Sequence, residues 1–335
     1  MLQSCNSLSQ MDGLLVVDKP VGPTSHDVVA RVRRALGERR IGHTGTLDPA
    51  ASGVLPLVLG RATRLARFLS ASDKSYDAVV RLGVATDTQD AAGTAIGPVH
   101  EGPWPSRDAI NRALDQFRGT FLQQPPAFSA KKVAGERSYR TARRAKREAT
   151  LPALPALPAP PAAAALPAPV AVSTTALDLI AVADELVTLR IDCSAGFYVR
   201  ALAHDLGVVL GTGAHLESLR RVRSGDLTLT EALPLDVLER DPGIAASAMV
   251  SVSRMLPALV SVQLTDEGVR RAVHGRDLGP GDFEKGVGSL FGGQTSAEKT
   301  PDPFYIRLID PAGDLVAIAT PIGASGLLHP AVVLV

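Results

Sequence analysis

Cysteine and aromatic residues are scarce in this 335-residue chain. Aromatic residues make up 4% of it, and Cys5 and Cys193 are the only cysteines. No CxxC or Cys/His spacing indicates a zinc site, and two distant cysteines do not make a disulfide framework. A reducing compartment fits this usage, and we expect a cytoplasmic protein.

Long apolar runs and an excess of one charge are also missing. No stretch of about 18 uninterrupted apolar residues predicts a membrane span, and the first dozen residues lack the charged-then-apolar pattern of a signal peptide. The formal net charge is +1, from 35 Lys and Arg against 34 Asp and Glu. A nucleic-acid surface would therefore depend on where the basic residues gather, not on their total.

What is present is the composition of a globular protein, with 45% apolar and 21% charged residues. The length suits one large domain and a small one. Residues 1–10 resemble a disordered leader, and the apolar run 13–18 predicts a buried strand. Thr24 or Ser25 can then N-cap a helix. The apolar face of that helix would be formed by Val28, Val29, Val32 and Leu36.

Strands and helices alternate irregularly after this point, which favours an α+β fold over a regular doubly wound sheet. Apolar periodicity predicts the following helices: one beginning near Ala62, one over 106–118 and one over 201–210. Alternation or short apolar runs predict the following strands: 76–84, 187–191 and the stretch Phe197 to Val199.

Two unusual segments adjoin each other in the middle of the chain. Residues 131–147 hold eight Lys or Arg against one acid, Glu136. Such a run is often a solvated helix face, but Tyr139 lies within it and a Pro-rich tract follows, which favours a phosphate-contacting arm. In 151–169 all nineteen residues are Ala, Pro or Leu, and seven are Pro. This tract predicts an extended surface insertion.

Composition changes again between 240 and 260. A Gly-rich stretch follows, and then three short strand-like runs at 305–309, 315–319 and 331–334. We therefore expect a main domain over 11–250 and a small, mainly β domain over 251–335.

The segment Gly42 to Leu55 is a glycine-containing loop that presents one carboxylate, Asp48, directly before Pro49. An isolated Asp-Pro is more often an N-cap or a turn than a catalyst. The proline biases Asp48 away from helical geometry. The function of this loop is therefore inferred from the motifs that accompany it and not from Asp48 alone.

Several ordered blocks accompany it over residues 12–235, and together they resemble the TruB-type pseudouridine synthases, which modify uridine 55 of tRNA. The blocks are Lys19 to Ser25, Gly42 to Leu55, Lys74-Ser75-Tyr76 with Arg81 to Gly83 and Thr86 to Asp90, Pro125 to Lys132 with Gly135, Arg137, Tyr139 and Arg143, Cys193 to Arg200, and Gly213 to Leu216 with Leu219 to Arg221.

The resemblance implies a pseudouridine-synthase fold: a central mixed, mainly antiparallel sheet flanked by helices. It also implies that the 251–335 domain is a PUA-like RNA-binding appendage. Pseudouridine formation breaks the N1–C1′ bond of uridine, rotates the uracil and rejoins it through C5. No redox change occurs, so we expect no cofactor and no metal. A carboxylate can serve as the nucleophile.

The resemblance also assigns residues. Asp48 would be the nucleophile, at C1′ or at C6, Arg200 its guanidinium partner, and Tyr76 the residue that stacks on uracil and transfers the C5 proton. His43 would fill the space that the flipped base leaves. The remaining candidates for substrate or RNA contact are Lys19, Lys132, Tyr198, Leu219, Arg39 and Arg40. The expected partner is the T-arm of tRNA, bound by a monomer with no obligatory protein partner.

One departure concerns the 151–169 tract, since relatives usually have a short connection there, and it puts the RNA-gripping geometry in doubt. Three alternatives remain open. The chain could be a guide-RNA-dependent synthase, although near-neutral charge argues against this. It could act mainly as a tRNA-folding chaperone, which needs no Asp48. It could be a glycoside hydrolase, with Asp90 as the second carboxylate that such enzymes use.

Overall fold

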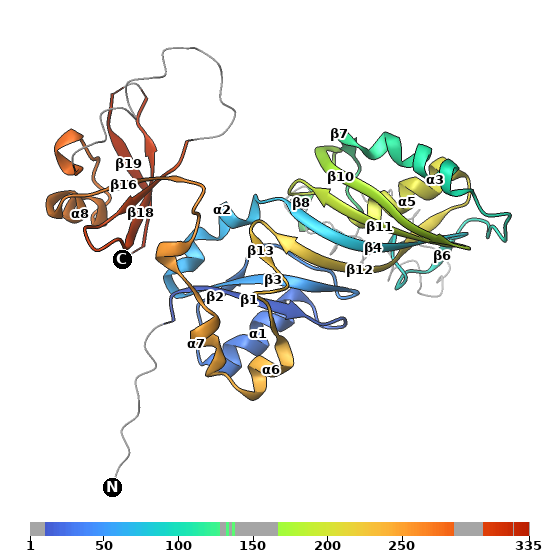
Figure 1. Cartoon of the computed structure of the whole chain (residues 1–335), viewed down its shortest axis with the longest axis horizontal. Helices are drawn as coiled ribbons and strands as arrows, with labels where there is room; N and C mark the ends of the chain where they lie inside the picture. The colour runs from blue at the N-terminus through green and yellow to red at the C-terminus, as the bar shows by residue number, and fades with distance from the viewer. Residues whose placement is uncertain are drawn as a thin grey trace, which may run out of the picture.

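A computed structural model describes residues 11–127, 132–133, 136–137, 167–284, 304–323 and 325–334. The predicted leader at 1–10, almost all of the basic run 131–147 and residues 151–166 of the Ala/Pro/Leu tract lie outside these ranges. The described residues form two main sheets, and the smaller one lies at one end of the molecule (Figure 1).

The large sheet has eleven strands, and its main path runs β14-β1-β3-β12-β4-β11-β10-β7. Only the pairs β1–β14 and β3–β12 are parallel. The expected mixed, mainly antiparallel sheet is thus confirmed. Its strands are β1 (Gly13–Lys19), β2 (Ile41–His43), β3 (Ala51–Leu59), β4 (Lys74–Leu82), β7 (Gly119–Gln123), β10 (Val170–Ala183), β11 (Leu186–Cys193), β12 (Ala214–Ser224), β13 (Leu227–Thr228), β14 (Leu233–Pro234) and β15 (Val250–Ser251). Separate two-stranded pairs are β5 (Ala85–Thr86) with β6 (Ala95–Ile96) and β8 (Lys132–Val133) with β9 (Glu136–Arg137).

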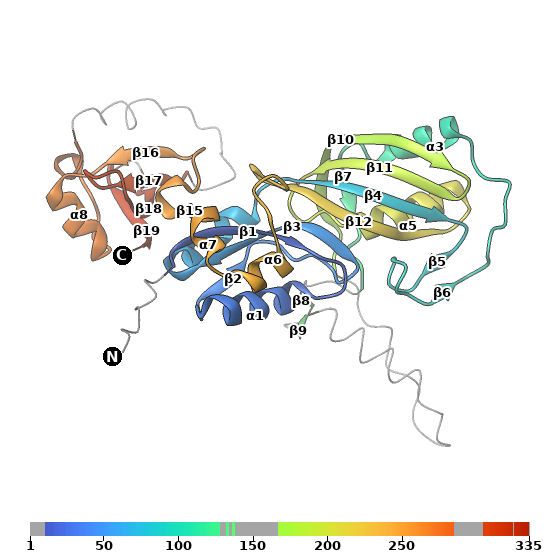
Figure 2. The ribbon, with the colours of Figure 1, turned by 60° about the horizontal axis from the view of Figure 1, so that its bottom comes forward.

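Helices cover the large sheet, with α1 and α6 under its β1–β3 part and α5 against β4 and β12 (Figure 2). The α-helices are α1 (Ser25–Leu36), α2 (Ala66–Ser70), α3 (Arg107–Leu114), α5 (Val199–Leu210), α6 (Leu235–Arg240), α7 (Ile244–Ala248) and α8 (Asp266–Val273). Short 3-10 turns are η1 (Gly60–Leu65), η2 (Asp115–Phe117), η3 (Val252–Arg254) and η4 (Pro280–Asp282).

Helix α1 forms where its cap and apolar spacing predict. The Thr24 side chain accepts from the Asp27 backbone N–H, and the Asp27 carboxylate accepts from the Thr24 N–H, which is a complete capping box. Gly37 ends the helix in the left-handed region, with φ +67°. The four predicted apolar residues are all buried.

The predicted strand over Phe197 to Val199 is wrong. Gly196 has φ +85°, so the chain turns there, and α5 starts at Val199 with Tyr198 as its N-cap. A three-residue apolar run does not distinguish a strand from the first turn of a buried helix. As a consequence, Arg200 projects from the first turn of a helix rather than from a strand.

The small sheet has the order β16 (Val260–Gln263), β17 (Ile306–Ile309), β18 (Leu315–Pro321) and β19 (Leu328–Val333). Helix α8, which the sequence pattern did not predict, packs on it. Leu315 and Ile318 of β18 join one apolar cluster with Leu14, Val16 and other residues of the large sheet. The two sheets therefore share part of their core.

Candidate active site

An open pocket of about 390 Å³ lies where β4, β12, the N-terminal end of α5 and the segment between β2 and β3 meet. We call that segment, residues 44–50, the Asp48 loop. The lining residues are His43, Thr44, Gly45, Thr46, Leu47, Asp48, Ser70, Lys74, Tyr76, Ser194, Gly196, Phe197, Tyr198, Val199, Arg200, Leu219 and Arg221.

The Asp48 loop is fixed from both sides. Leu47 is buried, and its N–H donates to the Ser25 hydroxyl (2.8 Å), which in turn donates to the Leu47 carbonyl (3.0 Å). The carbonyl of Pro49 accepts from the Gly22 N–H at 2.8 Å. Ser25 begins α1 and Gly22 precedes it, so the block Lys19 to Ser25 holds the block Gly42 to Leu55 in place. The Asp48 side chain remains 40% exposed at the pocket.

Arg200 is the direct partner of Asp48. Its Nε lies 2.8 Å from Asp48 Oδ2, and the Arg200 side chain is only 6% exposed. Its Nη1 donates to the Thr88 carbonyl at 2.8 Å. A guanidinium keeps its charge even when buried, so this ion pair orients the carboxylate.

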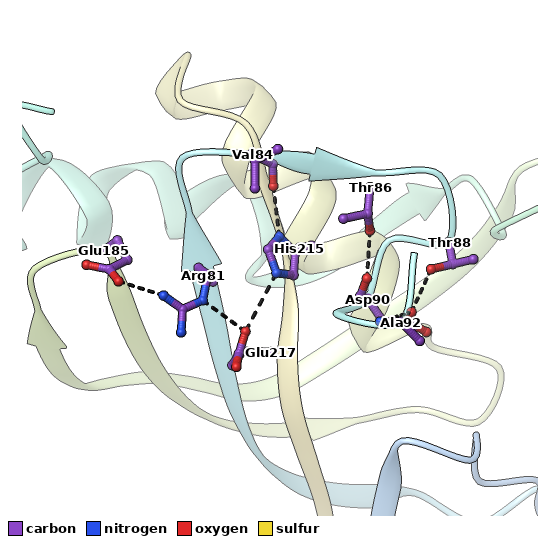
Figure 3. Close-up of polar contacts among 9 residues, drawn as sticks. All are labelled: Arg81, Val84, Thr86, Thr88, Asp90, Ala92, Glu185, His215 and Glu217. Atoms are coloured by element: carbon purple, nitrogen blue, oxygen red, sulfur yellow. Dashed lines mark hydrogen bonds and ion pairs between the residues drawn. The ribbon is translucent and has the colours of Figure 1, made fainter. Parts of the chain in front are cut away.

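The loop that supports Arg200, residues 86–92, is itself well connected (Figure 3). The Asp90 carboxylate accepts from the Thr88 hydroxyl (2.6 Å) and the Ala92 N–H (3.1 Å), and its carbonyl accepts from the Thr86 hydroxyl (2.7 Å). Asp90 Oδ2 also lies 3.9 Å from Arg200 Nε. Asp48 and Asp90 therefore face the same guanidinium.

His215 fastens β12 to the turn between β4 and β5 (Figure 3). Its Nδ1 lies 2.8 Å from the Val84 carbonyl and its Nε2 3.6 Å from the Glu217 carboxylate, which also accepts from Arg81. Hydrogen bonding to Arg81 lowers the pKa of Glu217. This network fixes the strand that carries Leu219 towards the pocket.

Tyr76 projects from β4 into the pocket and is 8% exposed. Burial raises the pKa of its hydroxyl, and the positive charge of Arg221 acts in the opposite direction. Asp48, Arg200 and Tyr76, which are far apart in the sequence, thus line one cavity. That proximity is the geometry that a nucleophile, its partner and a proton-transferring group require.

Lys19 is placed differently from the other candidates, because it is fully buried and does not line the pocket. Its ammonium donates to the carbonyls of Ala51 (2.6 Å), Pro20 (3.0 Å) and Pro49 (3.4 Å). Burial lowers the pKa of Lys19 to about 8, although the charge of Asp48 raises it. Lys19 therefore supports the Asp48 loop from behind.

Three other predicted residues line the pocket: His43, Tyr198 and Leu219. The His43 ring meets the His26 ring edge-on, with centroids 5.2 Å apart. Tyr198 is held by Gln123, whose side-chain amide exchanges hydrogen bonds with the Tyr198 backbone at 2.8 and 3.0 Å. Gln123 belongs to no predicted motif, so sequence reasoning missed it.

Arg39 and Arg40 are exposed in the turn between α1 and β2 and do not line the pocket. Lys132 begins β8, and its side chain lies outside the described part of the structure. The roles of all three in RNA contact stay predictions.

Two pocket residues were missed as site candidates, Lys74 and Arg221, although both belong to the motif blocks. Burial, together with the positive charge of Arg221, lowers the pKa of Lys74 to about 8. Both cations are almost fully buried. Their strand positions next to Tyr76 and Leu219 were the only available signal.

Within the described ranges, no group of three or more His, Cys, Asp or Glu side chains could hold a metal ion. None of the described helices is long and apolar enough to cross a membrane.

Comparison with known proteins decides the family. Residues 33–155 match the model of the TruB family pseudouridylate synthase N-terminal domain, and residues 200–250 match that of the tRNA pseudouridylate synthase B C-terminal domain. A protein named tRNA pseudouridine synthase B from Solibacter usitatus is 40% identical over 97% of this chain and 100% of its own length. The chain belongs to the TruB family of pseudouridine synthases. A Geobacter sulfurreducens protein of the same name is 38% identical to this TruB-family enzyme, over 90% of the chain and 93% of its own length.

Solved structures agree on the fold. An H/ACA RNP bound to a substrate RNA containing 2′-deoxyuridine includes a chain that superposes on this TruB-family enzyme with a TM-score of 0.65, at 24% identity, over 96% of this chain and 85% of that chain. A Cbf5-Nop10-Gar1 complex gives a TM-score of 0.63 at 25% identity, over 92% of this chain and 78% of that chain. The pseudouridine-synthase fold expected from the sequence is confirmed.

Proposed function

We propose that this enzyme converts uridine 55 in the T-loop of tRNA to pseudouridine, with Asp48 as nucleophile, Arg200 as its partner and Tyr76 as the residue that handles the C5 proton. Two relatives that cover at least 90% of this chain are named tRNA pseudouridine synthase B, which supports the substrate. The observation that carries the assignment of Asp48 is its 2.8 Å ion pair with the nearly buried Arg200 beside Tyr76.

The reaction needs the target base outside its stack, because Asp48 cannot reach a nucleotide within a folded loop. Unstacking costs on the order of a few kcal/mol, which pocket contacts offset. His43, at the pocket rim, fills the vacated space, while Tyr198 and Leu219 contact the flipped nucleotide. Asp48 then forms a transient covalent bond at C1′ or C6, the uracil turns, and C5 joins C1′.

Binding of the T-arm extends beyond the pocket. Phosphates supply much of the affinity of RNA complexes, and we assign such contacts to Arg39, Arg40 and the run that contains Lys132. Residues 251–335 form a PUA-like unit that grips the RNA, and residues 11–250 the catalytic domain. The enzyme acts in the cytoplasm as a monomer, without an obligatory protein partner, cofactor or metal.

The test is incubation of purified protein with an unmodified tRNA transcript, without added cofactor or metal, followed by mapping of pseudouridine. We expect one pseudouridine, at position 55. Asp48→Asn abolishes product while tRNA affinity stays within about threefold, because the amide removes the nucleophile but keeps the shape. Product from Asp48→Asn would remove the assignment.

A matched control is Asp236→Asn, since Asp236 lies on α6 with a 72% exposed side chain and does not line the pocket. This variant should retain wild-type activity. Free uracil instead of pseudouridine would favour a hydrolase with Asp90 as second carboxylate. An Asp48→Asn variant that still assists tRNA folding would separate a chaperone contribution from catalysis.

A further inference from the structure

Arg221 is a buried cation beneath the pocket for which the reaction described above has no use. It is 1% exposed. Its Nε donates to the Val54 carbonyl at 2.7 Å, and its Nη2 donates to the Gly45 carbonyl at 3.1 Å. None of the ion pairs found among the described residues involves it. A buried guanidinium without a carboxylate is costly, so its retention at this place needs a reason.

The position of Arg221 relative to Tyr76 gives that reason. The two residues are direct cross-strand partners on β12 and β4, and both line the pocket. Directly opposed residues of an antiparallel pair bring their side chains together on one face. Burial raises the pKa of the Tyr76 hydroxyl, and the positive charge of Arg221 lowers it.

Arg221 also holds the Asp48 loop. Gly45, whose carbonyl accepts from Nη2, lies three residues before Asp48, and Val54 lies on β3 just after it. A Cβ added at Gly45 would lie 3.4 Å from Arg221 Nη1, so the loop backbone packs directly on the guanidinium. One side chain therefore contacts both the loop that carries the nucleophile and the tyrosine.

We propose that Arg221 is a positioning residue that holds the Tyr76 hydroxyl and the Asp48 loop in one geometry and stabilises the phenolate of Tyr76 while the C5 proton is removed. This inference rests on the proposed function and deepens it. The other charged groups near Tyr76 are Asp48, whose charge opposes a phenolate, and Lys74 and Arg200, which line the same pocket. Arg221 is the cation that lies directly opposite Tyr76 on the neighbouring strand.

The proton balance of this step is closed. Once C5 is joined to C1′, the C5–H bond breaks, the proton passes to the Tyr76 oxygen, and the electron pair enters the C5=C6 double bond of the product. The proton that Tyr76 gave up beforehand is matched by the one taken up at N1. Substrate and product are isomers, and the enzyme ends in its starting state.

The experiment measures single-turnover product formation on tRNA transcripts made with ordinary or C5-deuterated uridine. Arg221→Gln should slow product formation by about 100-fold, in the range of general acid–base contributions, and should increase the deuterium isotope effect at unchanged tRNA affinity. Arg221→Lys should recover part of the rate, because it restores the charge but not the fork of donors.

A double-mutant cycle then tests whether Arg221 acts through Tyr76. In a Tyr76→Phe background, Arg221→Gln or Arg221→Lys should cost less than about threefold more, since the coupled partner is already gone. The matched control is Arg220→Gln, the neighbouring arginine, which pairs with Asp18 on the other face of β12. It should leave the isotope effect unchanged.

Additive losses in the cycle, or an isotope effect that Arg221→Gln and Arg221→Lys leave unchanged, would overturn the inference. If Arg221→Gln does not fold, Arg221→Lys carries the same cycle. A wild-type enzyme that makes no pseudouridine on the transcript would refute the proposed function itself. An active wild type with an additive cycle would refute only the role of Arg221.

Discussion

Arg200 and Arg221 are both nearly excluded from water, yet their surroundings differ. Arg200 meets two carboxylates, Asp48 at 2.8 Å and Asp90 at 3.9 Å. Arg221 donates to backbone carbonyls and lies opposite a tyrosine on the neighbouring strand. A guanidinium that faces a carboxylate orients that carboxylate, whereas one that faces neutral acceptors remains a source of positive charge for its neighbours. In this pocket, Arg200 therefore orients a carboxylate, whereas Arg221 supplies positive charge to its neighbours.

Lys19 and Lys74 predict an alkaline limit to activity. Burial lowers the pKa of each to about 8, so their ammonium groups lose the proton as pH rises through about 8. A neutral amine has one donor fewer for the carbonyls that each ammonium binds, those of Pro20, Pro49 and Ala51 at Lys19 and those of Ser70 and Ser72 at Lys74. We expect the single-turnover rate to fall above about pH 8, measured from about pH 6 to about pH 10.

Stability should move in the opposite direction over part of this range. The folded pKa of about 8 lies below the usual lysine pKa of 10.5, so the unfolded chain binds more protons between these values. The lysines therefore favour folding increasingly as pH rises through that window. Urea unfolding at each pH separates the two effects. Lys19→Arg or Lys74→Arg should extend activity to higher pH. A flat rate profile would contradict the assignment.

At the scale of elements, the parallel pair β3–β12 depends on close backbone approach at Gly53. Gly53 has φ +105°, and a Cβ there would lie 2.1 Å from the Arg221 carbonyl oxygen. Gly53→Ala should therefore destabilise the protein by about 2 kcal/mol or more, because strain and overpacking add. It should also impair activity, since it moves Arg221. Urea unfolding and the tRNA assay measure both.

Gly313 provides the control for this substitution. It has φ +90°, but nothing lies within 4 Å of an added Cβ. Gly313→Ala should cost only the backbone term, about 1–2 kcal/mol, and leave activity unchanged. If both variants lost the same unfolding free energy, the close packing of Gly53 against β12 would contribute nothing to stability.

The sequence predicts a helix or strand well where its separate signals agree. Thr24, the four apolar residues of α1 and Gly37 agree on one helix, so that its start and end are clear. The start of α5 is not clear, because Phe197 to Val199 fits a strand or a helix turn until the positive φ of Gly196 is known.

The site divides in the same way. The resemblance names Asp48, Tyr76 and Arg200, but no local sequence pattern predicts that they meet. The strand order β3-β12-β4 and the packing of α5 on β12 and β4 bring them together. Pattern alone also cannot decide which of the adjacent Arg220 and Arg221 is buried. Only the register of β12 decides it.

At the scale of the whole molecule, the shared apolar cluster should make both sheets unfold together. Ile318 of β18 is fully buried in a cluster with Leu14 and Val58 of the large sheet. Trp104, the one tryptophan of the chain, packs against the other core of the large sheet. Its fluorescence therefore reports on a region distant in structure from β18.

We expect Ile318→Ala to lower the unfolding free energy seen by Trp104 fluorescence by about 2–5 kcal/mol, the usual cost of such a cavity. The control is Val260→Ala, at a 38% exposed position of the small sheet, which should shift it by less than about 1 kcal/mol. If Ile318→Ala left the unfolding transition seen by Trp104 fluorescence unchanged, the two sheets would unfold independently.

The bulge in β12 between Leu216 and Ser218 has a consequence for how this enzyme tolerates change. It lies before Leu219, Arg220 and Arg221 in the strand, and it determines to which face of the sheet each of these three side chains points. A single inserted or deleted residue that shifted this alternation by one position would turn Arg220 inward and Arg221 out to solvent. One irregularity of the backbone thereby selects which arginine lines the pocket, and length variation among variants should be excluded from this strand while loops elsewhere accept it.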